Sequence, residues 1–206
     1  MKPIRIVTPP LGANVYLIID EKIALIDAGG DCAFLIKALR RFVNPKDVEY
    51  IFLTHSHFDH AMAVADMKKF GCKVVMHSLE FDLLKRGLTT LGYIYYFEPD
   101  ILVRGGETFE LGEIKLEVIH TPGHTSGSVC YYEPNRKWLF SGDTVFKYGF
   151  GRYDLPSGNP YDLLKSLELL ASLDVECLYP GHEDVVEGNA KDYILKNLEV
   201  LKSLVS

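Results

Sequence analysis

Four potential metal ligands occupy one short segment of this sequence. The segment follows directly on the apolar run Val48–Thr54, which predicts a strand, and its ligands are His55, His57, Asp59 and His60. Residues two apart at the end of a strand lie on one side, so the first two histidines can hold one ion. The helical turn that follows can direct the next two side chains toward a second ion. Imidazole and carboxylate together suit Zn²⁺, and also Fe²⁺ or Mn²⁺.

Three further ligands stand in turns or at strand ends later in the chain. His124 lies in the turn T-P-G-H, Asp143 follows the apolar run that ends in F-S-G-D-T, and His182 lies in Y-P-G-H. Each therefore sits at or just past the end of a predicted strand. If the sheets stack, these strand ends can open on one edge. The pattern predicts a metal site assembled from separate parts of the chain.

The elements that must position these ligands form two halves. In the first half the apolar pattern predicts strands at Ile4–Thr8, Asn14–Asp20, Ile23–Asp27, Val48–Thr54 and Lys73–His77, and helices over 31–42 and 59–70. In the second half it predicts strands at Ile114–Ile119, Val129–Tyr132 and Lys137–Ser141, and helices at Tyr161–Ser172 and Asn189–Val205. Helical spacing of Ile194, Leu198, Leu201 and Val205 in the last helix predicts a stripe that packs in the core.

Composition restricts the class of protein. A chain of 206 residues with 48% hydrophobic and 24% charged residues is expected to form one soluble domain, residues 1–206. The net charge of −6 argues against a nucleic-acid partner. We expect no membrane partner, because no run approaches the length of a membrane span, and we find no signal peptide. The four cysteines form no C-x-x-C pair, which favours reduced core thiols and a cytoplasmic location.

The motifs H-S-H-F-D-H, T-P-G-H, S-G-D-T and P-G-H, in this order and spacing, resemble those of the metallo-β-lactamase-fold hydrolases. The resemblance runs over nearly the whole chain. It implies an α+β fold, a four-layer αβ/βα sandwich with a dinuclear metal site at the edge between the two sheets. By position it implies a first ion held by His55, His57 and His124. It implies a second ion held by Asp59, His60 and His182, with Asp143 bridging the two.

Within the family, the segment S-G-D-T-V-F-K-Y-G-F-G-R-Y-D-L-P-S-G is similar to the glyoxalase II-like (hydroxyacylglutathione hydrolase-like) branch. Asp143 stands where secreted β-lactamases commonly carry cysteine, which points away from antibiotic hydrolysis. Two features depart from the branch. We expect no C-terminal glutathione-binding helical domain, and Ala61-Met62 replaces a frequent Gly-Gly pair. The resemblance therefore implies the metal chemistry, and these departures leave the thiol of the substrate open.

Thioester hydrolysis is the reaction that this set of residues would perform with the fewest additional groups. Two divalent ions, most simply Zn²⁺, supply a hydroxide at neutral pH, and Asp59 can orient it as a catalytic residue. No further His or Glu stands in a motif that would serve as general acid. A thiol has a pKa near 8.5, so it can leave as a thiolate without taking up a proton, whereas an amine cannot leave as an anion.

Other functions compete with this one. A persulfide dioxygenase would hold a single iron through His55, His57, His124 and Asp143, and a lactonase would use the same metals. Nucleic-acid processing is disfavoured by the charge. A non-enzymatic binding module is disfavoured because all seven ligand positions are filled.

Recognition of a small-molecule thioester substrate is assigned to two basic residues after the S-G-D-T motif. Arg152 and Lys147 can reach a substrate carboxylate, although a structural ion pair between Arg152 and Asp154, or a solvated Lys147, explains the same residues. The aromatic run Tyr93–Phe97 suits a pocket wall, a homodimer contact or ordinary core packing. His77 and His120 are expected to satisfy structural hydrogen bonds.

Overall fold

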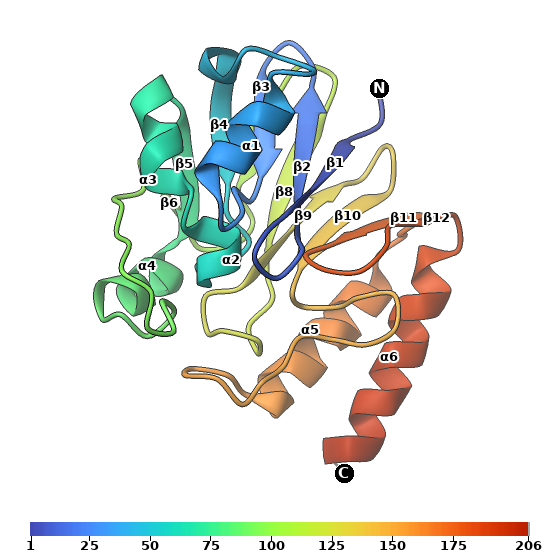
Figure 1. Cartoon of the computed structure of the whole chain (residues 1–206). Coiled ribbons are helices and arrows are strands. Elements are labelled where there is room, and N and C mark those ends of the chain that lie inside the picture. The colour runs from blue at the N-terminus through green and yellow to red at the C-terminus, as the bar shows by residue number, and fades with distance from the viewer. Residues whose placement is uncertain (206) are drawn as a thin grey trace. The chain divides into compact units, whose positions relative to one another are not determined.

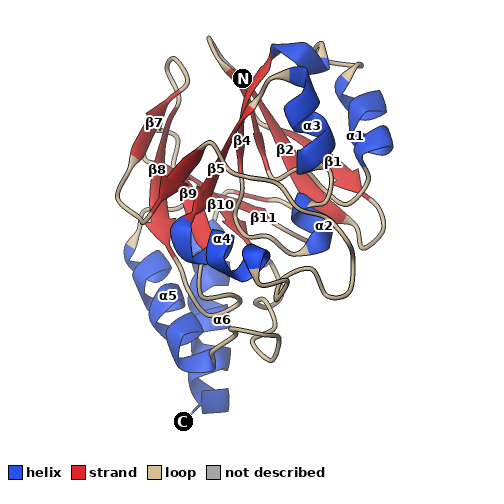
Figure 2. Ribbon diagram, turned by 90° about the vertical axis from the view of Figure 1, so that its left-hand side faces the viewer, coloured by secondary structure: helices blue, strands red, loops and turns tan. Residues whose placement is uncertain are grey.

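The computed structural model describes residues 1–205 and divides into two compact units. The first unit comprises Met1–Val103 and Glu110–Ile114, and the second comprises residues 104–109 and 115–205. The chain forms two six-stranded sheets, and both carry helices (Figures 1 and 2). The predicted α+β class is thus confirmed. The interpretation of residues 1–206 as one domain stays a prediction.

The strands of the first sheet are hydrogen-bonded in chain order, from β1 to β6. Strands β1, β2 and β3 pair antiparallel, whereas β3, β4, β5 and β6 pair parallel. Parallel pairing places the carboxyl ends of β3 and β4 at the same edge, where a ligand site is expected in such sheets. The strands are β1 (Ile4–Thr8), β2 (Ala13–Ile19), β3 (Ile23–Ile26), β4 (Val48–Phe52), β5 (Lys73–His77) and β6 (Ile101–Val103).

The helices of the first unit connect the parallel strands. Helix α1 begins after Asp31, whose carboxylate accepts a hydrogen bond from the backbone N–H of Phe34 and so caps the helix. The helices are α1 (Cys32–Leu39), α2 (Phe58–Ala61), α3 (Val64–Met67) and α4 (Ser78–Lys85), with short 3₁₀ turns at Pro45–Asp47 and Lys68–Phe70. Helix α4 and strand β6 have no counterpart in the sequence prediction.

The predicted continuous helix over 59–70 is wrong, because the backbone breaks between α2 and α3. The carbonyl of His60 accepts hydrogen bonds from the N–H groups of Ala28 and Gly29, at 2.8 and 3.0 Å. The N–H of Ala63 donates to the carbonyl of Gly29 at 3.1 Å and not to a carbonyl of its own helix. The loop after β3 thus competes with the helical hydrogen bonds and interrupts them at this point.

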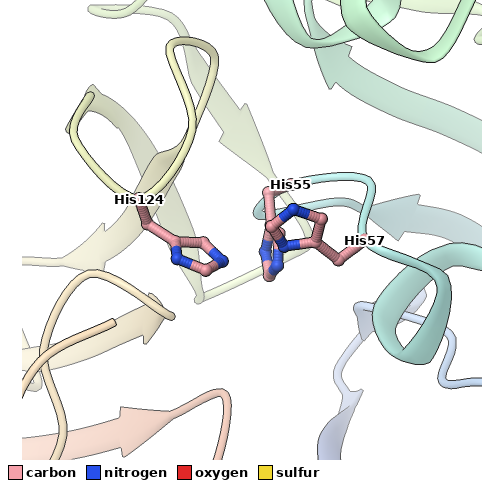
Figure 3. A group of neighbouring side chains, drawn as sticks. All are labelled: His55, His57 and His124. Atoms are coloured by element: carbon pink, nitrogen blue, oxygen red, sulfur yellow. The ribbon is translucent and has the colours of Figure 1, made fainter. Parts of the chain in front are cut away.

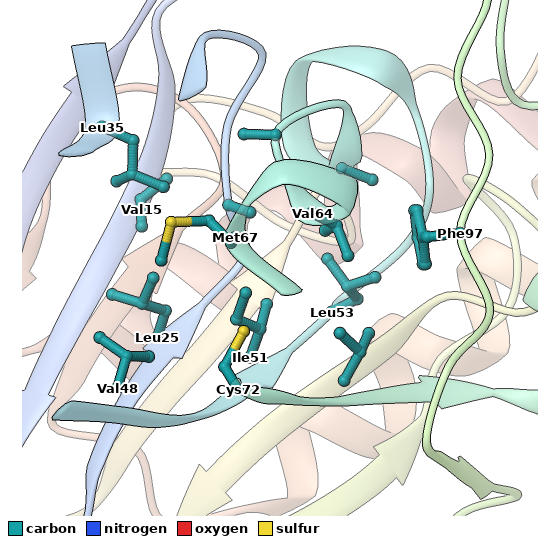
Figure 4. Close-up of a cluster of buried hydrophobic side chains, with 14 of the residues drawn as sticks. Val15, Leu25, Leu35, Val48, Ile51, Leu53, Val64, Met67, Cys72 and Phe97 are labelled. Atoms are coloured by element: carbon teal, nitrogen blue, oxygen red, sulfur yellow. The ribbon is translucent and has the colours of Figure 1, made fainter. Parts of the chain in front are cut away.

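The core of the first unit lies where α1 and α3 cover its sheet (Figure 4). Leu25 of β3, Ile51 of β4 and Leu53, which directly follows β4, project into it and are buried. Leu35 of α1 and Met67 of α3 meet them there, fully buried. This packing holds the strands whose ends carry the ligands.

The second sheet has the order β12-β11-β10-β9-β8-β7. Strands β8, β9 and β10 pair antiparallel, and β10 pairs parallel with β11. Its strands are β7 (Thr108–Glu110), β8 (Lys115–His120), β9 (Val129–Glu133), β10 (Trp138–Gly142), β11 (Cys177–Pro180) and β12 (Val186–Glu187).

Two amphipathic helices, α5 (Pro160–Ser172) and α6 (Ala190–Val205), pack side by side in the second unit (Figures 1 and 2). The side chain of Asn159 caps α5 by accepting from the N–H groups of Tyr161 and Asp162. The stripe predicted in the last helix packs in the core, since Ile194 and Leu201 are fully buried. No helix in the described part of the chain is long and apolar enough to cross a membrane.

The four cysteines are free thiols, as predicted. Cys72 and Cys130 are buried, whereas Cys32 and Cys177 are only partly buried. Burial raises the pKa of the Cys130 thiol to about 11, so this thiol stays protonated near neutral pH.

The turn that carries His124 is packed against the start of α5, and this packing gives a test of the fold. Gly123 has φ +138°, and a Cβ there would overlap the backbone of Leu163, whereas Gly188 has φ +75° and open space. Gly188→Ala is expected to cost about 1 kcal/mol of unfolding free energy, from backbone strain alone. Gly123→Ala is expected to cost about 3 kcal/mol or more, because the helix must also move. Urea unfolding of both variants measures this, and equal losses would contradict the packing.

Candidate functional site

The seven predicted ligands are divided between the two units. Each unit carries its ligands on segments that follow strand ends, as the sequence predicts. The first unit contains His55, His57, Asp59 and His60, and the second contains His124, Asp143 and His182. Figure 3 shows His55 and His57 on the segment after β4, and His124 on the turn after β8.

The ligands of the first unit are buried and close to one another. The rings of His55 and His57 meet edge to face with centroids 4.8 Å apart, and the rings of His55 and His60 lie 4.2 Å apart. The Nε2 of His60 lies 3.6 Å from a carboxylate oxygen of Asp59. His57 is the residue before α2, so the helix begins within the motif and turns Asp59 and His60 away from the strand direction.

Asp27, at the end of β3, orients this set, although sequence analysis did not identify it as a functional residue. Its carboxylate is buried and accepts hydrogen bonds from the N–H and the hydroxyl of Thr54, both at 2.8 Å. It also lies 2.9 Å from Nδ1 of His60, which must donate because a carboxylate accepts. The Thr54 hydroxyl oxygen in turn lies 3.1 Å from Nδ1 of His55. Asp27 therefore fixes His60 directly and His55 through Thr54.

The ligands of the second unit are arranged around one oxygen. Oδ2 of Asp143 lies 3.6 Å from Nε2 of His124 and 3.6 Å from Nε2 of His182. The N–H of Gly181 donates to the carbonyl of Gly142 at 2.7 Å, which ties the loop after β11 to the end of β10. This backbone bond lies one residue from each of two ligands and so fixes their separation.

The turn that carries His124 is fixed by α5 and by the loop at Arg152. The carbonyl of Gly123 accepts from the N–H of Asn159 at 2.8 Å, and the carbonyl of Pro122 accepts from the Ser166 hydroxyl at 2.7 Å. Nδ1 of His124 lies 2.7 Å from the backbone carbonyl oxygen of Arg152. Because a carbonyl only accepts, Nδ1 carries the hydrogen and Nε2 is left as the ligand atom.

This set of donors fits divalent metal ions. Three buried histidines, His55, His60 and His124, have Nδ1 engaged by a protein oxygen, which is the usual way a protein presents Nε2 to a metal. Neutral imidazoles and carboxylates in this proportion suit Zn²⁺, Fe²⁺ or Mn²⁺. The set provides enough ligands for a dinuclear centre, and its composition does not single out one metal.

The two predicted substrate-binding residues lie in the second unit, where Arg152 is exposed and Lys147 is partly buried. Arg152 forms a bidentate ion pair with Asp154, with N···O distances of 2.8 and 2.7 Å. Its hydrogen bonds lower the pKa of Asp154 to about 2. The ammonium group of Lys147 lies 4.8 Å from the ring centre of Tyr148. The expected ion pair is therefore present, and a role in substrate binding stays a prediction for both residues.

The two remaining histidines make structural hydrogen bonds, as predicted. Nδ1 of His77 accepts from the N–H of Leu79 at 3.2 Å and caps α4. Nε2 of His120 lies 3.0 Å from the carbonyl oxygen of Ser126, to which it donates.

Comparison with known proteins identifies the family. The sequence profile of the Metallo-beta-lactamase superfamily matches residues 8–182, a range that includes all seven predicted ligands. The chain belongs to the metallo-β-lactamase superfamily. It is 36% identical over 193 residues to a probable metallo-hydrolase of Methanocaldococcus jannaschii, a match that covers 88% of this chain and 92% of that protein. The family that the motifs resemble is thus confirmed, and with it the assignment to the metallo-hydrolases.

Two solved structures share the fold. A structure described as BLEG-1 B3 metallo-beta-lactamase has a TM-score of 0.85 at 30% identity, covering 97% of this chain and 99% of that one. A structure described as TTHA1623 in a di-iron-bound form has a TM-score of 0.73 at 31% identity, covering 96% of this chain and 98% of that one. The predicted metallo-β-lactamase fold is confirmed by these matches.

A relative whose name includes its substrate matches this chain over part of that relative's length. The hydroxyacylglutathione hydrolase of Brucella ovis is 38% identical over 146 residues, which cover 70% of this chain and 51% of that enzyme. The chain therefore corresponds to about half the length of this relative.

Removing one acceptor from Asp27 tests its orienting role. Asp27→Asn keeps the volume but replaces one oxygen by an N–H₂ donor. Its single oxygen cannot accept from the Thr54 N–H, which bonds Oδ1, and also from the Thr54 hydroxyl and His60, which bond Oδ2. We expect the affinity for divalent metal to fall about 10- to 100-fold, measured by competition with a chelator. Asp31→Asn is the matched control, because asparagine caps α1 equally well. Equal affinity in the two variants would contradict the orienting role.

Proposed function

We propose that this chain is a metal-dependent thioesterase of glyoxalase II type, with two divalent ions held jointly by the ligands of its two units. In this proposal His55, His57 and His124 hold one ion, Asp59, His60 and His182 hold the other, and Asp143 bridges them. The candidate ligands fall into matching groups of three, with a third group formed by His55, His60 and Asp143.

The observation that carries the proposal is the position of Asp143. One carboxylate oxygen stands 3.6 Å from Nε2 of both His124 and His182, which are assigned to different ions. A carboxylate shared between two imidazoles in this way suits a bridging ligand. The backbone hydrogen bond between Gly142 and Gly181 lies beside Asp143 and is consistent with a carboxylate held in one position.

A pair of divalent ions, when bound, lowers the pKa of water toward neutrality and polarises a substrate carbonyl. The chain's own contribution is to hold and orient. Asp59 is assigned the role of orienting the attacking water, because its carboxylate can accept a hydrogen bond from it. Burial of Asp59 among the histidines of the motif keeps competing water away from that oxygen.

The choice of a thioester rests on the histidine count. The sequence has seven histidines, of which five are assigned as ligands. The other two, His77 and His120, are engaged in structural hydrogen bonds. No imidazole is therefore left to protonate a leaving group, which favours a thiolate that departs unprotonated over an amine that cannot.

The substrate side of the proposal is a small-molecule thioester, such as a hydroxyacyl-thiol conjugate. The similarity to the Brucella hydroxyacylglutathione hydrolase supports this class. The physiological thiol is left open, because the match covers about half of that enzyme. Four free thiols support a reducing, cytoplasmic setting. The proposal includes a homodimer and no nucleic-acid or membrane partner.

An iron-dependent persulfide dioxygenase is the second candidate. Imidazole and carboxylate donors suit iron as well as zinc, and the TTHA1623 structure is described as di-iron-bound. In this alternative a single iron is held by His55, His57, His124 and Asp143, and lactone hydrolysis on two ions is a weaker variant of the hydrolase.

Metal content combined with a substrate panel tests the proposal. Protein purified without added metal is expected to hold about two divalent ions per chain and to hydrolyse thioesters. Removal of the ions by a chelator should abolish the activity, and re-addition should restore it. The panel includes a lactone, a β-lactam and a matched amide, and the amide should react at least about 1000-fold more slowly than the thioester.

Two outcomes would contradict the thioesterase. Metal-loaded protein that leaves every thioester intact would exclude it. One iron per chain, with oxygen uptake on a thiol persulfide, would favour the dioxygenase.

A pair of variants tests the role of Arg152. If its guanidinium binds a substrate carboxylate, Arg152→Met should raise KM about tenfold and leave kcat nearly unchanged. Asp154→Asn, which releases Arg152 from its ion pair, should leave KM unchanged or lower it. If the ion pair is only structural, both variants should show the same small loss of stability and no change in KM.

A further inference from the structure

Ser56 lies between the ligands His55 and His57 and is held by side chains from two other segments. Its N–H and its hydroxyl donate to the same carboxylate oxygen of Glu80, at 2.8 and 2.7 Å. Its hydroxyl oxygen also lies 2.7 Å from that of Thr89. Its carbonyl accepts a hydrogen bond from the Tyr95 hydroxyl. The backbone of this one residue is thus fixed on both of its polar groups.

These contacts constrain the two peptide groups that flank Ser56. Its N–H belongs to the peptide group shared with His55, and its carbonyl belongs to the peptide group shared with His57. Peptide groups are planar, so holding both in place restricts the backbone torsions that set the directions of the two imidazoles. Neither contact comes from a neighbouring strand. Glu80 and Tyr95 follow 24 and 39 residues later in the chain.

The carboxylate of Glu80 is well suited to this role. Ser56, Glu80 and Thr89 are all buried, and hydrogen bonds to a carboxylate are stronger than bonds between neutral groups. Glu80 stands in the first turn of α4, whose start is fixed by the cap from His77. The acceptor is therefore carried by an element that is itself anchored at the end of β5.

The aromatic segment provides the second support. Tyr93 stacks on Phe58, the residue after His57, with ring centroids 4.0 Å apart and planes inclined by 16°. Tyr95 is partly buried and stacks with the buried Phe97 at 6.5 Å. The segment Tyr93–Phe97, whose purpose the sequence left open, therefore contacts the ligand loop at two points, Ser56 and Phe58.

We propose that Glu80 and Tyr95 are positioning residues for the His55–His57 pair, acting through the backbone of Ser56. Neither is assigned as a ligand of an ion. Their effect is to hold the two imidazoles in a ready arrangement before an ion binds. The inference rests on the proposed metal function. It adds two residues that hold the backbone between the ligands in place and are not ligands themselves.

Two neighbouring tyrosines provide the test. Tyr95→Phe removes only the hydroxyl that bonds Ser56, whereas Tyr96→Phe removes an exposed hydroxyl 3.3 Å from Glu98. Metal affinity is measured by competition of Zn²⁺ with a chelator, and ligand geometry by the visible spectrum of the Co²⁺-loaded protein. We expect Tyr95→Phe to weaken binding of at least one ion about tenfold and to shift the Co²⁺ bands. Tyr96→Phe should match the unmodified protein in both.

Substitutions of Glu80 provide an independent readout. Glu80→Gln retains an oxygen that can accept from the Ser56 N–H, so its metal affinity should lie within about threefold of the unmodified protein. Glu80→Ala removes the acceptor and should lower the affinity about 100-fold. If Glu80→Ala does not fold, the comparison of Tyr95→Phe with Tyr96→Phe decides alone.

The outcomes separate this inference from the proposed function. If Tyr95→Phe lowers only the unfolding midpoint of the metal-free protein, and its metal affinities and Co²⁺ spectrum are unchanged, the positioning role is overturned and the metal function stands. If the unmodified protein binds no metal, both are overturned. Thioester hydrolysis is assayed separately, so a metal-binding protein without that activity would overturn the thioesterase alone.

Discussion

The hydrogen bond between Asp27 and His60 is the contact on which the first ligand set depends. An imidazole can present either of its two nitrogens, and only a partner on one of them decides which nitrogen faces a metal. Asp27 makes that decision for His60 directly and for His55 through Thr54. The carbonyl of Arg152 does the same for His124 in the second unit. Both units therefore use an oxygen on Nδ1 to direct Nε2.

The same demand explains irregularities in the backbone around these residues. The loop after β3, which begins with Asp27, also takes the carbonyl of His60 into hydrogen bonds with Ala28 and Gly29. Asp27 itself has φ 61°, an unusual value for a residue other than glycine. A regular helix through this region would give up those contacts. The broken helix and the left-handed backbone conformation of Asp27 are consistent with a loop that holds His60 through both its ring and its carbonyl.

The second ligand set is positioned differently. Its three ligands follow β8, β10 and β11. The backbone bond from Gly181 to Gly142 and the contact between the Thr121 and Thr144 hydroxyls link these segments. The turn before His124 is anchored on α5 through Gly123 and Asn159. Because these anchors are backbone groups, the turns can consist of few residues, rich in glycine and proline, and still hold the ligand side chains in fixed directions.

Much of this arrangement could be predicted from the sequence, because strands with apolar alternation and ligands at their ends leave a strong local signal. Strands β1 and β5 begin and end at the predicted residues, and α5 differs by one residue. Helix α4 was missed because it follows β5 with no loop between and takes its cap from His77, a residue type that seldom signals a helix start. Asp27 was missed because one acidic residue at the end of a strand resembles an ordinary turn. Its role arises from Thr54 and His60, which lie 27 and 33 residues away.

The distribution of histidines links the fold to the chemistry. Five of them are assigned as ligands, and each of the other two caps or braces backbone in its own unit, so the chain has no imidazole to donate a proton to a departing group. An enzyme that needs such a donor must place a residue of suitable pKa near the leaving atom. In the proposed function, the lack of a spare imidazole favours leaving groups that are stable as anions near neutral pH. Among acyl derivatives, thioesters meet that condition and amides do not. The structural use of His77 and His120 is thus an observation that favours a thioester substrate in the proposed function, although neither residue is assigned to the site.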